Sequence, residues 1–308
     1  MYTKNSKISF IVPAYNCSKT IEESIDSIFN GNFENGDEVI IVDDASTDNT
    51  KKILDDFKKK YPTIKILKHN INRGTAAAGR NTAIDSSSNN LIFTLDADNI
   101  LVKGSVKILK EKILNGEADM VSTSEIWFFN DINNKVTKKW IFSKKIDLQY
   151  CLSNSINPCS TGNYLFTKKS WKISGRYFEP GIENQTLDSW TFGIRQLASG
   201  FKMITVPNTY YLHRTGINSH WIRENAKGNV SLSALIALIP FLELVEDEDR
   251  EYIFSPEGRY KWFDEIDQKP LKIKNQTIEK KSKVIRIPYK QNLLQRIFYK
   301  LKKIIKSI

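Results

Sequence analysis

The first hundred residues alternate short apolar runs with amphipathic helical patterns, and this alternation restricts the fold more than any other feature. The apolar runs are "ISFIV" at 8–12, "EVIIV" at 38–42, "IKIL" at 64–67 and "LIFTL" at 91–95. The segments between them place apolar residues at helical spacing. Such alternation predicts βαβ units, and strands that are apolar throughout indicate a sheet covered on both faces. We therefore expect an α/β protein with a Rossmann-like, mostly parallel sheet flanked by helices.

Composition indicates a globular protein with reduced thiols. The chain has 308 residues, of which 40% are hydrophobic, enough for a sizeable core. Its three cysteines contain no C-x-x-C pair and are too few for a disulfide framework, so we expect a cytosolic protein. The apolar run before Pro13 is too short for a signal peptide. The longest apolar run, at 233–245, is interrupted by Pro240, so we expect no transmembrane segment.

The net charge of +11 is concentrated at one end of the chain. Residues 268–308 contain thirteen Lys and Arg against one acid, Glu279, a surplus of +12, so the remainder carries −1. An enzyme of nucleic acids more often spreads its basic residues over the catalytic body, with aromatic residues for stacking. We therefore expect no nucleic-acid partner, although a nucleic-acid-binding protein that uses this basic tail remains an alternative.

Each of the four apolar runs is followed by polar residues. Because the carboxyl ends of parallel strands meet at one edge of a sheet, these residues are expected to share a rim where ligands bind. Each cluster alone could be a helix cap or a turn, whereas four in succession indicate a binding site. In chain order the candidates are Pro13, Tyr15 and Asn16, then Asp43 and Asp44, then Asn72, Gly74 and Arg80, then Asp96 and Asp98.

The chemistry of these candidates fits a nucleotide diphosphate. The first loop, "VPAYNCSKT", contains no glycine, which excludes the G-x-G-x-x-G dinucleotide loop and the P-loop. Asp43 or Asp44 could accept hydrogen bonds from a base or ribose, and Arg80 could bind phosphate. Asp96 and Asp98, two carboxylates at the end of a buried strand, need a positive partner, and a hard divalent cation that bridges a diphosphate would suit them.

Four motifs, "IVPAYN", "VDDASTDNT", "NRGTAAAGRN" and "LDADN", resemble in order and spacing the nucleotide-binding half of family 2 glycosyltransferases with the GT-A fold. The resemblance implies that Asp43 and Asp44 contact the nucleoside and that Arg80 lies at the diphosphate. It also implies that Asp96 contacts the ribose and, with Asp98, holds Mn²⁺ or Mg²⁺. The implied reaction moves a sugar from a nucleotide diphosphate sugar, a UDP sugar in the first instance, to a hydroxyl acceptor with inversion at the anomeric carbon.

Such a transfer needs a base for the acceptor hydroxyl, normally a carboxylate. Family members usually carry an acidic pair followed by a helix with an arginine about two turns on. Counting back from Arg195 places Asp188 at the first acidic position and Ser189 at the second, a departure from the usual Glu-Asp pair. We predict Asp188 as the base, with Glu183 in reserve, and note that Asp188 could also cap the helix that follows.

Two further residues of the second half are candidates. His213 closes a strand at a position where family members often have a histidine facing the diphosphate or metal, although a lone histidine is more often structural. Trp190 lies two residues after Asp188 and is predicted to contact the acceptor, although tryptophans in a chain of this size usually belong to the core.

The predicted organisation has three parts: a GT-A domain over residues 1–220, a helical segment at 221–267 and a basic tail at 268–308. Within the domain, residues 1–100 form the nucleotide-binding half and 101–220 the acceptor half. The tail contains an amphipathic pattern at 291–308 whose basic face suits an anionic membrane, although most such helices pack on protein.

We therefore expect a cytoplasmic, peripheral enzyme at the inner face of the cell membrane. It would act in cell-surface polysaccharide or glycolipid assembly on acceptors such as lipid-linked glycans. A sugar-nucleotidylyltransferase, which usually has a glycine-rich first loop, and a non-catalytic nucleotide-sugar-binding protein remain alternatives.

Overall fold

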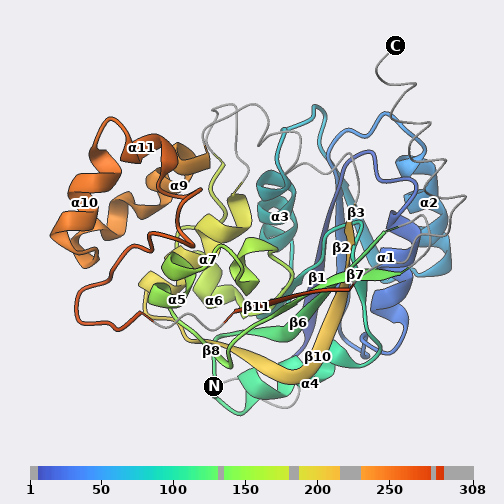
Figure 1. Ribbon diagram of the computed structural model, residues 1–308. Helices are drawn as coiled ribbons and strands as arrows, with labels where there is room; N and C mark the ends of the chain where they lie inside the picture. Colours follow the sequence, from blue (N-terminus) through green and yellow to red (C-terminus); the bar gives the residue numbers. More distant parts are fainter. Residues whose placement is uncertain (1–5, 131–134, 180–186, 216–229, 279–281, 288–308) are drawn as a thin grey trace, which may run out of the picture.

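The computed structural model describes residues 6–130, 135–179, 187–215, 230–278 and 282–287 (Figure 1). One mixed sheet runs through the molecule, with strands in the order β11-β7-β6-β9-β4-β1-β2-β3, and β10 pairs with β6 beside this path. Helices cover the sheet, so the molecule is an α/β protein as the alternating pattern predicted.

The first half of the chain forms the parallel part of the sheet. Its strands are β1 (Ile8–Ala14), β2 (Glu38–Asp43), β3 (Ile64–Lys68) and β4 (Leu91–Thr94), and all three pairings among them are parallel. They coincide with the four apolar runs. Side chains in the middle of β1 and β2, such as Phe10 and Ile40, are buried, because helices pack on both faces of this part of the sheet. The intervening helices are α1 (Ile21–Phe29), α2 (Thr50–Lys60) and α3 (Ala76–Asp85).

Helix α3 packs closely on β1, and a glycine makes the close approach possible. A Cβ atom built on Gly79 would lie 3.1 Å from the Cβ of Pro13, tighter than ordinary van der Waals contact. This packing holds Arg80, the next residue of the helix, near the carboxyl ends of the parallel strands. The sequence "AAAGR" therefore combines small residues for contact with one long cationic side chain.

The second half of the chain extends the sheet largely through antiparallel pairs. β9 (Leu165–Thr167) joins β4 to β6 (Met120–Asn130), and β7 (Val136–Ile141) and β11 (Lys283–Arg286) continue to the edge. β10 (Met203–Thr215) is parallel to β6 and antiparallel to β5 (Ile100–Leu101) and β8 (Lys145–Ile146). The helical elements of this half are α4 (Ser105–Leu114), α5 (Leu148–Ser153), η1 (Pro158–Ser160), α6 (Lys168–Ile173) and α7 (Asp188–Ala198).

Helices also form within the segment for which helices were expected. They are α9 (Val230–Leu238), η2 (Ile239–Leu244), α10 (Asp247–Phe254) and α11 (Gly258–Lys261). The apolar run at 233–245 changes from α-helix to 3₁₀-helix at Ile239, where Pro240 cannot donate a backbone hydrogen bond. Within the described residues, no helix is long and apolar enough to span a membrane.

The basic tail is described only in part. Its residues Lys283–Arg286 form strand β11, which lies along β7 (Figure 1). The predicted amphipathic helix at 291–308 lies outside the described residues, and the division of the chain into three parts stays a prediction.

Candidate active site

The four polar clusters come from the carboxyl ends of the parallel strands and from the loops that follow them. In the first two loops, the backbone amide of Thr47 donates to Asn16 Oδ1 at 2.7 Å, and the amide of Asn16 donates to Ser46 Oγ at 3.0 Å. Asn16 adopts a left-handed backbone conformation, with φ of 47°, which asparagine tolerates better than most residues. Tyr15 beside it is 43% exposed. The two loops are thus joined, and the exposed Tyr15 ring is available to a ligand.

Asp44 organises the loop that follows β3. Its Oδ1 lies 2.6 Å from His69 Nδ1, and its two carboxylate oxygens accept the backbone N–H of Arg73 at 3.1 and 3.0 Å. In the same loop Asn72 Oδ1 accepts the amide of Gly74, whose φ of 73° favours glycine. The Asp44 carboxylate is therefore already used by the chain, whereas sequence reasoning assigned it to the nucleoside.

Asp43 is also buried and its carboxylate accepts the backbone amide of Ser46 at 3.0 Å. It shapes the turn after β2 in the same way that Asp44 shapes the turn after β3. Contact of either aspartate with a nucleoside stays a proposal, because these hydrogen bonds leave further lone pairs on each carboxylate.

Arg80 is the centre of the candidate site. Its side chain is 3% exposed, and its two terminal nitrogens donate to Asp188 Oδ2 and to Asp96 Oδ1, each at 2.6 Å. Burial alone would lower the pKa of the guanidinium, but the two carboxylates outweigh burial and raise that pKa above its ordinary value. Arg80 was expected to face the diphosphate, whereas here it joins the predicted base to the predicted metal-binding motif. We name Asp96, Arg80 and Asp188 the central cluster.

Three residues that sequence reasoning missed support the central cluster. Asn163 accepts the Asp96 amide at 2.8 Å and donates its own side-chain amide to Asp96 Oδ2 at 3.0 Å. The ring of Tyr177 lies under the guanidinium, 5.2 Å from Arg80 Cζ. Arg195, to which the sequence assigned no role in the site, donates to the carbonyl of Arg176 at 2.7 Å and so holds the chain beside Tyr177. Their contacts join distant parts of the chain, so no local pattern marks them.

Asp98 lies in the loop after β4, and His213 lies near the end of β10. Asp98 is half-buried, and its carbonyl accepts Arg214 Nε at 3.1 Å, while the amide of Arg214 donates to Asn99 Oδ1 at 3.1 Å. Arg214 also pairs with Glu23. These contacts tie the end of β10 to the loop that carries the aspartate pair, and Arg214 was not recognised from the sequence.

His213 is partly exposed, but its Nδ1 is buried and has no hydrogen-bond partner among the described residues. Burial lowers the pKa of the imidazole to about 4, although Asp96 acts in the opposite direction. The ring is therefore neutral near pH 7 and keeps a lone pair. A neutral imidazole with an unused nitrogen is compatible with a metal ligand.

The residues present supply some, but not all, of the ligands that a hard divalent ion needs. Asp96 and Asp98 offer carboxylate oxygens, which Mn²⁺ and Mg²⁺ prefer, and His213 offers a neutral nitrogen. Within the described part of the chain, however, no three His, Cys, Asp or Glu side chains converge into a preformed metal cluster. A divalent ion held by these residues would therefore take further oxygen ligands from elsewhere.

Two other predicted residues are not part of the described site. Trp190 is 1% exposed, and its ring packs against Phe263 at 4.7 Å and Trp262 at 6.3 Å between ring centroids. Residues two apart on a helix do not share a face, so Asp188 can face the site while Trp190 faces the core. We therefore withdraw Trp190 from the acceptor contacts. Glu183, the reserve base, lies outside the described residues.

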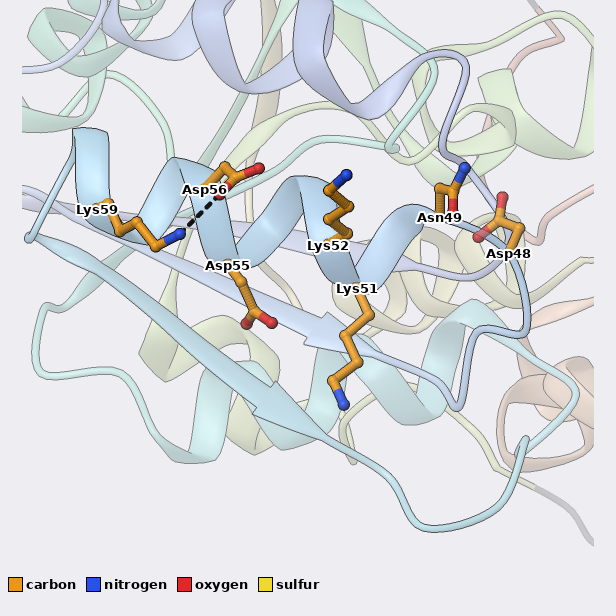
Figure 2. Close-up of a pocket in the computed structure, with 7 residues that line it drawn as sticks. All are labelled: Asp48, Asn49, Lys51, Lys52, Asp55, Asp56 and Lys59. Carbon is orange, nitrogen blue, oxygen red and sulfur yellow. Dashed lines mark hydrogen bonds and ion pairs between the residues drawn. The ribbon is translucent and has the colours of Figure 1, made fainter.

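A shallow groove with a volume of about 470 Å³ lies along the outer face of α2. Figure 2 shows its lining, seven polar or charged side chains from the helix and the turn before it, including the ion pair of Lys59 with Asp56 at 2.8 Å. None of the predicted site residues lines this groove, so we do not assign it to a substrate.

Gly162 allows a test of the packing beside the central cluster. Its φ is 73°, and a Cβ atom there would lie 2.3 Å from Ser189 Oγ. We expect Gly162→Ala to lower the free energy of unfolding by about 3 kcal/mol, from the left-handed conformation and the clash together. Gly104→Ala is the control, because Gly104 has a φ of 75° with nothing within 4 Å, and it should cost only about 1 kcal/mol. If urea unfolding shows that the two variants lose the same free energy of unfolding, the predicted clash at Gly162 is contradicted.

Comparisons with known sequences identify the family of the chain. The model of glycosyl transferase family 2 matches residues 9–173, more than half of the chain. A GalNAc(5)-diNAcBac-PP-undecaprenol beta-1,3-glucosyltransferase of Campylobacter jejuni is 24% identical over 83% of this chain and 78% of its own length. A poly(ribitol-phosphate) beta-glucosyltransferase of Bacillus spizizenii is 37% identical, but over 34% of this chain and 16% of its own length. With glycosyltransferase GlyG of Streptococcus pneumoniae, 33% identical, the match spans 37% of either chain.

Solved structures share the fold. TarS 1-349 of S. aureus in complex with UDP-GlcNAc superposes with a TM-score of 0.61 at 19% identity, covering 84% of this chain and 73% of that chain. The mannosyltransferase PcManGT from Pyrobaculum calidifontis, in complex with GDP-Man and Mn²⁺, superposes with a TM-score of 0.57 at 18% identity. This match covers 78% of this chain and 65% of that chain. By its sequence match, its motifs and its fold, the chain belongs to glycosyl transferase family 2 and has the GT-A fold.

Proposed function

We propose that the protein is a metal-dependent, inverting glycosyltransferase that moves a sugar from a nucleotide diphosphate sugar to a hydroxyl acceptor. The observation that carries the proposal is the central cluster, in which one buried arginine joins the predicted base Asp188 to Asp96 of the predicted metal-binding pair. These residues are far apart in sequence and come from the two halves that the reaction requires, one for the donor and one for the acceptor. Family membership disfavours a sugar-nucleotidylyltransferase.

The roles of the residues follow from charge. The Asp188 carboxylate accepts a hydrogen bond from Arg80, and an oxygen that accepts one hydrogen bond keeps a lone pair for the proton of the acceptor hydroxyl. Arg80 fixes the positions of Asp188 and Asp96 relative to each other, while Asn163 orients Asp96. A divalent ion held by Asp96, Asp98 and His213 would neutralise the charge that develops on the leaving diphosphate.

The choice of donor and acceptor rests on the relatives. Structures of TarS contain UDP or UDP-GlcNAc, so we propose a UDP sugar as the donor. Relatives from Campylobacter jejuni and Escherichia coli are named for diphosphoundecaprenol-linked acceptors. We therefore propose that the acceptor of this protein is a lipid-linked glycan of cell-surface assembly.

Asp98→Asn tests the metal role. We expect affinity for a UDP sugar, measured with Mn²⁺ by calorimetry, to fall about tenfold or more, because one anionic ligand becomes a neutral amide. With a chelator present, the variant and the wild type should bind alike. Asp119→Asn is the control, since Asp119 accepts the backbone amide of Lys202 in a turn outside the central cluster. If the Mn²⁺-dependent gain in affinity survives in Asp98→Asn, this aspartate is no ligand.

Peripheral attachment to the inner face of the cell membrane is the remaining part of the proposal. It is supported by the basic, amphipathic sequence at 291–308, where each Lys or Arg near an anionic surface contributes about 1 kcal/mol. We expect the full chain to sediment with phosphatidylglycerol vesicles and a chain ending at Pro288 to remain in the supernatant. Equal sedimentation of both, or binding indifferent to salt, would remove the membrane proposal and leave the catalytic one intact.

A further inference from the structure

Four residues form one row across the strands at the sheet edge. His213 of β10 is paired with Phe128 of β6, Phe128 with Lys138 of β7, and Lys138 with Arg286 of β11. Residues directly opposite each other on neighbouring strands project from the same face of a sheet. The contacts agree, because the rings of His213 and Phe128 lie 4.9 Å apart and Lys138 Nζ lies 4.0 Å from the Phe128 ring centroid. We name these residues the cationic row.

Lys138 and Arg286 lie directly opposite each other on β7 and β11, and neither forms an ion pair with a carboxylate within the described part of the chain. Like charges directly opposite on neighbouring strands are unfavourable. The pKa of Lys138 is accordingly lowered, first by burial and then by the charge of Arg286. An anion placed between the two side chains would relieve this repulsion, and their side chains are accessible to one, since Lys138 is half-buried and Arg286 is exposed.

An apolar surface adjoins the two cations. Trp140 lies two residues after Lys138 on the same face of β7, and its ring packs edge-on against Phe128 at 4.7 Å. Its partner on the edge strand, Val284, is 42% exposed. The combination of two cations with half-exposed aromatic and aliphatic side chains suits an anionic group that is attached to an apolar one.

The row leads away from the central cluster. The residue after His213, Arg214, contacts Asn99 and the carbonyl of Asp98, so this end of the row adjoins the loop that carries the aspartate pair. Three strand spacings separate His213 from Arg286, about 14 Å. A group bound by the cations would therefore lie outside the donor site but within reach of a molecule that enters it.

We propose that Lys138 and Arg286 bind the phosphate or diphosphate group of the acceptor, and that Trp140 and Val284 contact the apolar group attached to this phosphate. The inference rests on the proposed function, because it assigns the row to the acceptor of that reaction. It also identifies the acceptor as a phosphate ester, independently of which sugar it carries.

Equilibrium binding of hexyl diphosphate tests the inference, with saturating UDP and Mn²⁺ to occupy the donor site. We expect Lys138→Met to weaken binding about tenfold and Arg286→Met somewhat less, because each loses one charged donor to phosphate. Lys139→Met is the matched control: it removes the same charge from the next residue, whose Nζ lies 3.4 Å over the Trp127 ring on the opposite face of the sheet. The control should change binding less than twofold.

The outcomes separate this inference from the proposed function. UDP binding should be the same in the wild type and the three variants. A wild-type protein that does not bind UDP would count against the proposed function alone. Wild-type protein that does not bind hexyl diphosphate, or variants that all bind it equally, would overturn the inference. So would a loss in Lys138→Met that appears only with phosphatidylglycerol vesicles, because the anion would then be a membrane headgroup.

Discussion

Replacement of Asp188 by Asn is expected to lower kcat about 1,000-fold while affinity for the nucleotide sugar stays within about threefold of wild type. The amide keeps the size of the carboxylate and can still accept a hydrogen bond from Arg80, but it cannot take up the proton of the acceptor hydroxyl. Because proton removal occurs in the transition state, ground-state binding of the donor is spared. Initial rates and donor binding, measured on the same preparation, give both quantities.

Asp147→Asn is the matched control. Asp147 also stands at the start of a helix, where its carboxylate accepts the amide of Tyr150 at 2.8 Å, but it lies outside the central cluster. This variant should keep its turnover. If Asp188→Asn retains turnover, or if Glu183→Gln shows the selective loss of kcat instead, the base has been assigned to the wrong carboxylate. Loss of donor binding in Asp188→Asn would mean that Asp188 mainly positions Arg80. Retained donor binding with no turnover even in the wild type would favour the non-catalytic binding protein.

Arg80→Met is expected to lower the free energy of unfolding by about 3 kcal/mol at pH 7 in chelator, because it leaves two carboxylates without their cation. Asp96 and Asp188 have side chains 26% and 16% exposed, so water compensates only part of this loss. Urea unfolding monitored by circular dichroism measures the change. In an Asp188→Asn background the same substitution should cost less, since one of the two negative charges is already gone.

Arg250→Met provides the comparison for Arg80. Arg250 pairs with Asp247 on the surface of α10, where that carboxylate is 71% exposed, and exposed pairs contribute about 0.5 kcal/mol. Equal losses for Arg80→Met and Arg250→Met would show that burial does not strengthen the central cluster. A cost for Arg80→Met that is unchanged by Asp188→Asn would show that the two residues are not coupled.

The sequence predicted the parallel half of the fold well, because its signals are local. Each of the four apolar runs became a strand, since a strand buried on both faces needs apolar residues throughout. The polar residues after these runs lie at one edge for the same topological reason. The antiparallel half was only outlined, and the addition of Lys283–Arg286 to the sheet depends on pairing with β7, about 145 residues earlier in the chain.

The candidate site was predicted as a set of residues but not as a set of contacts. Arg80 and Asp188 are 108 positions apart, so no motif reveals that they form an ion pair. Asn163 supports Asp96 from an irregular turn after η1, where sequence periodicity carries no information. Trp190 was misassigned because proximity in sequence was taken for proximity in space, whereas α7 turns this residue toward the core.

The most direct test of the central claim is equilibrium binding of UDP-glucose, UDP-GlcNAc and GDP-mannose to the wild-type chain, each with Mn²⁺ and again with excess chelator. We predict that a UDP sugar binds most tightly and that its affinity falls at least about tenfold when the metal is removed, because in the proposed site the aspartate pair would hold an ion that attracts the diphosphate. Failure of all three to bind, or affinities that are the same with Mn²⁺ and with chelator, would contradict the proposed metal-dependent transfer from a nucleotide sugar.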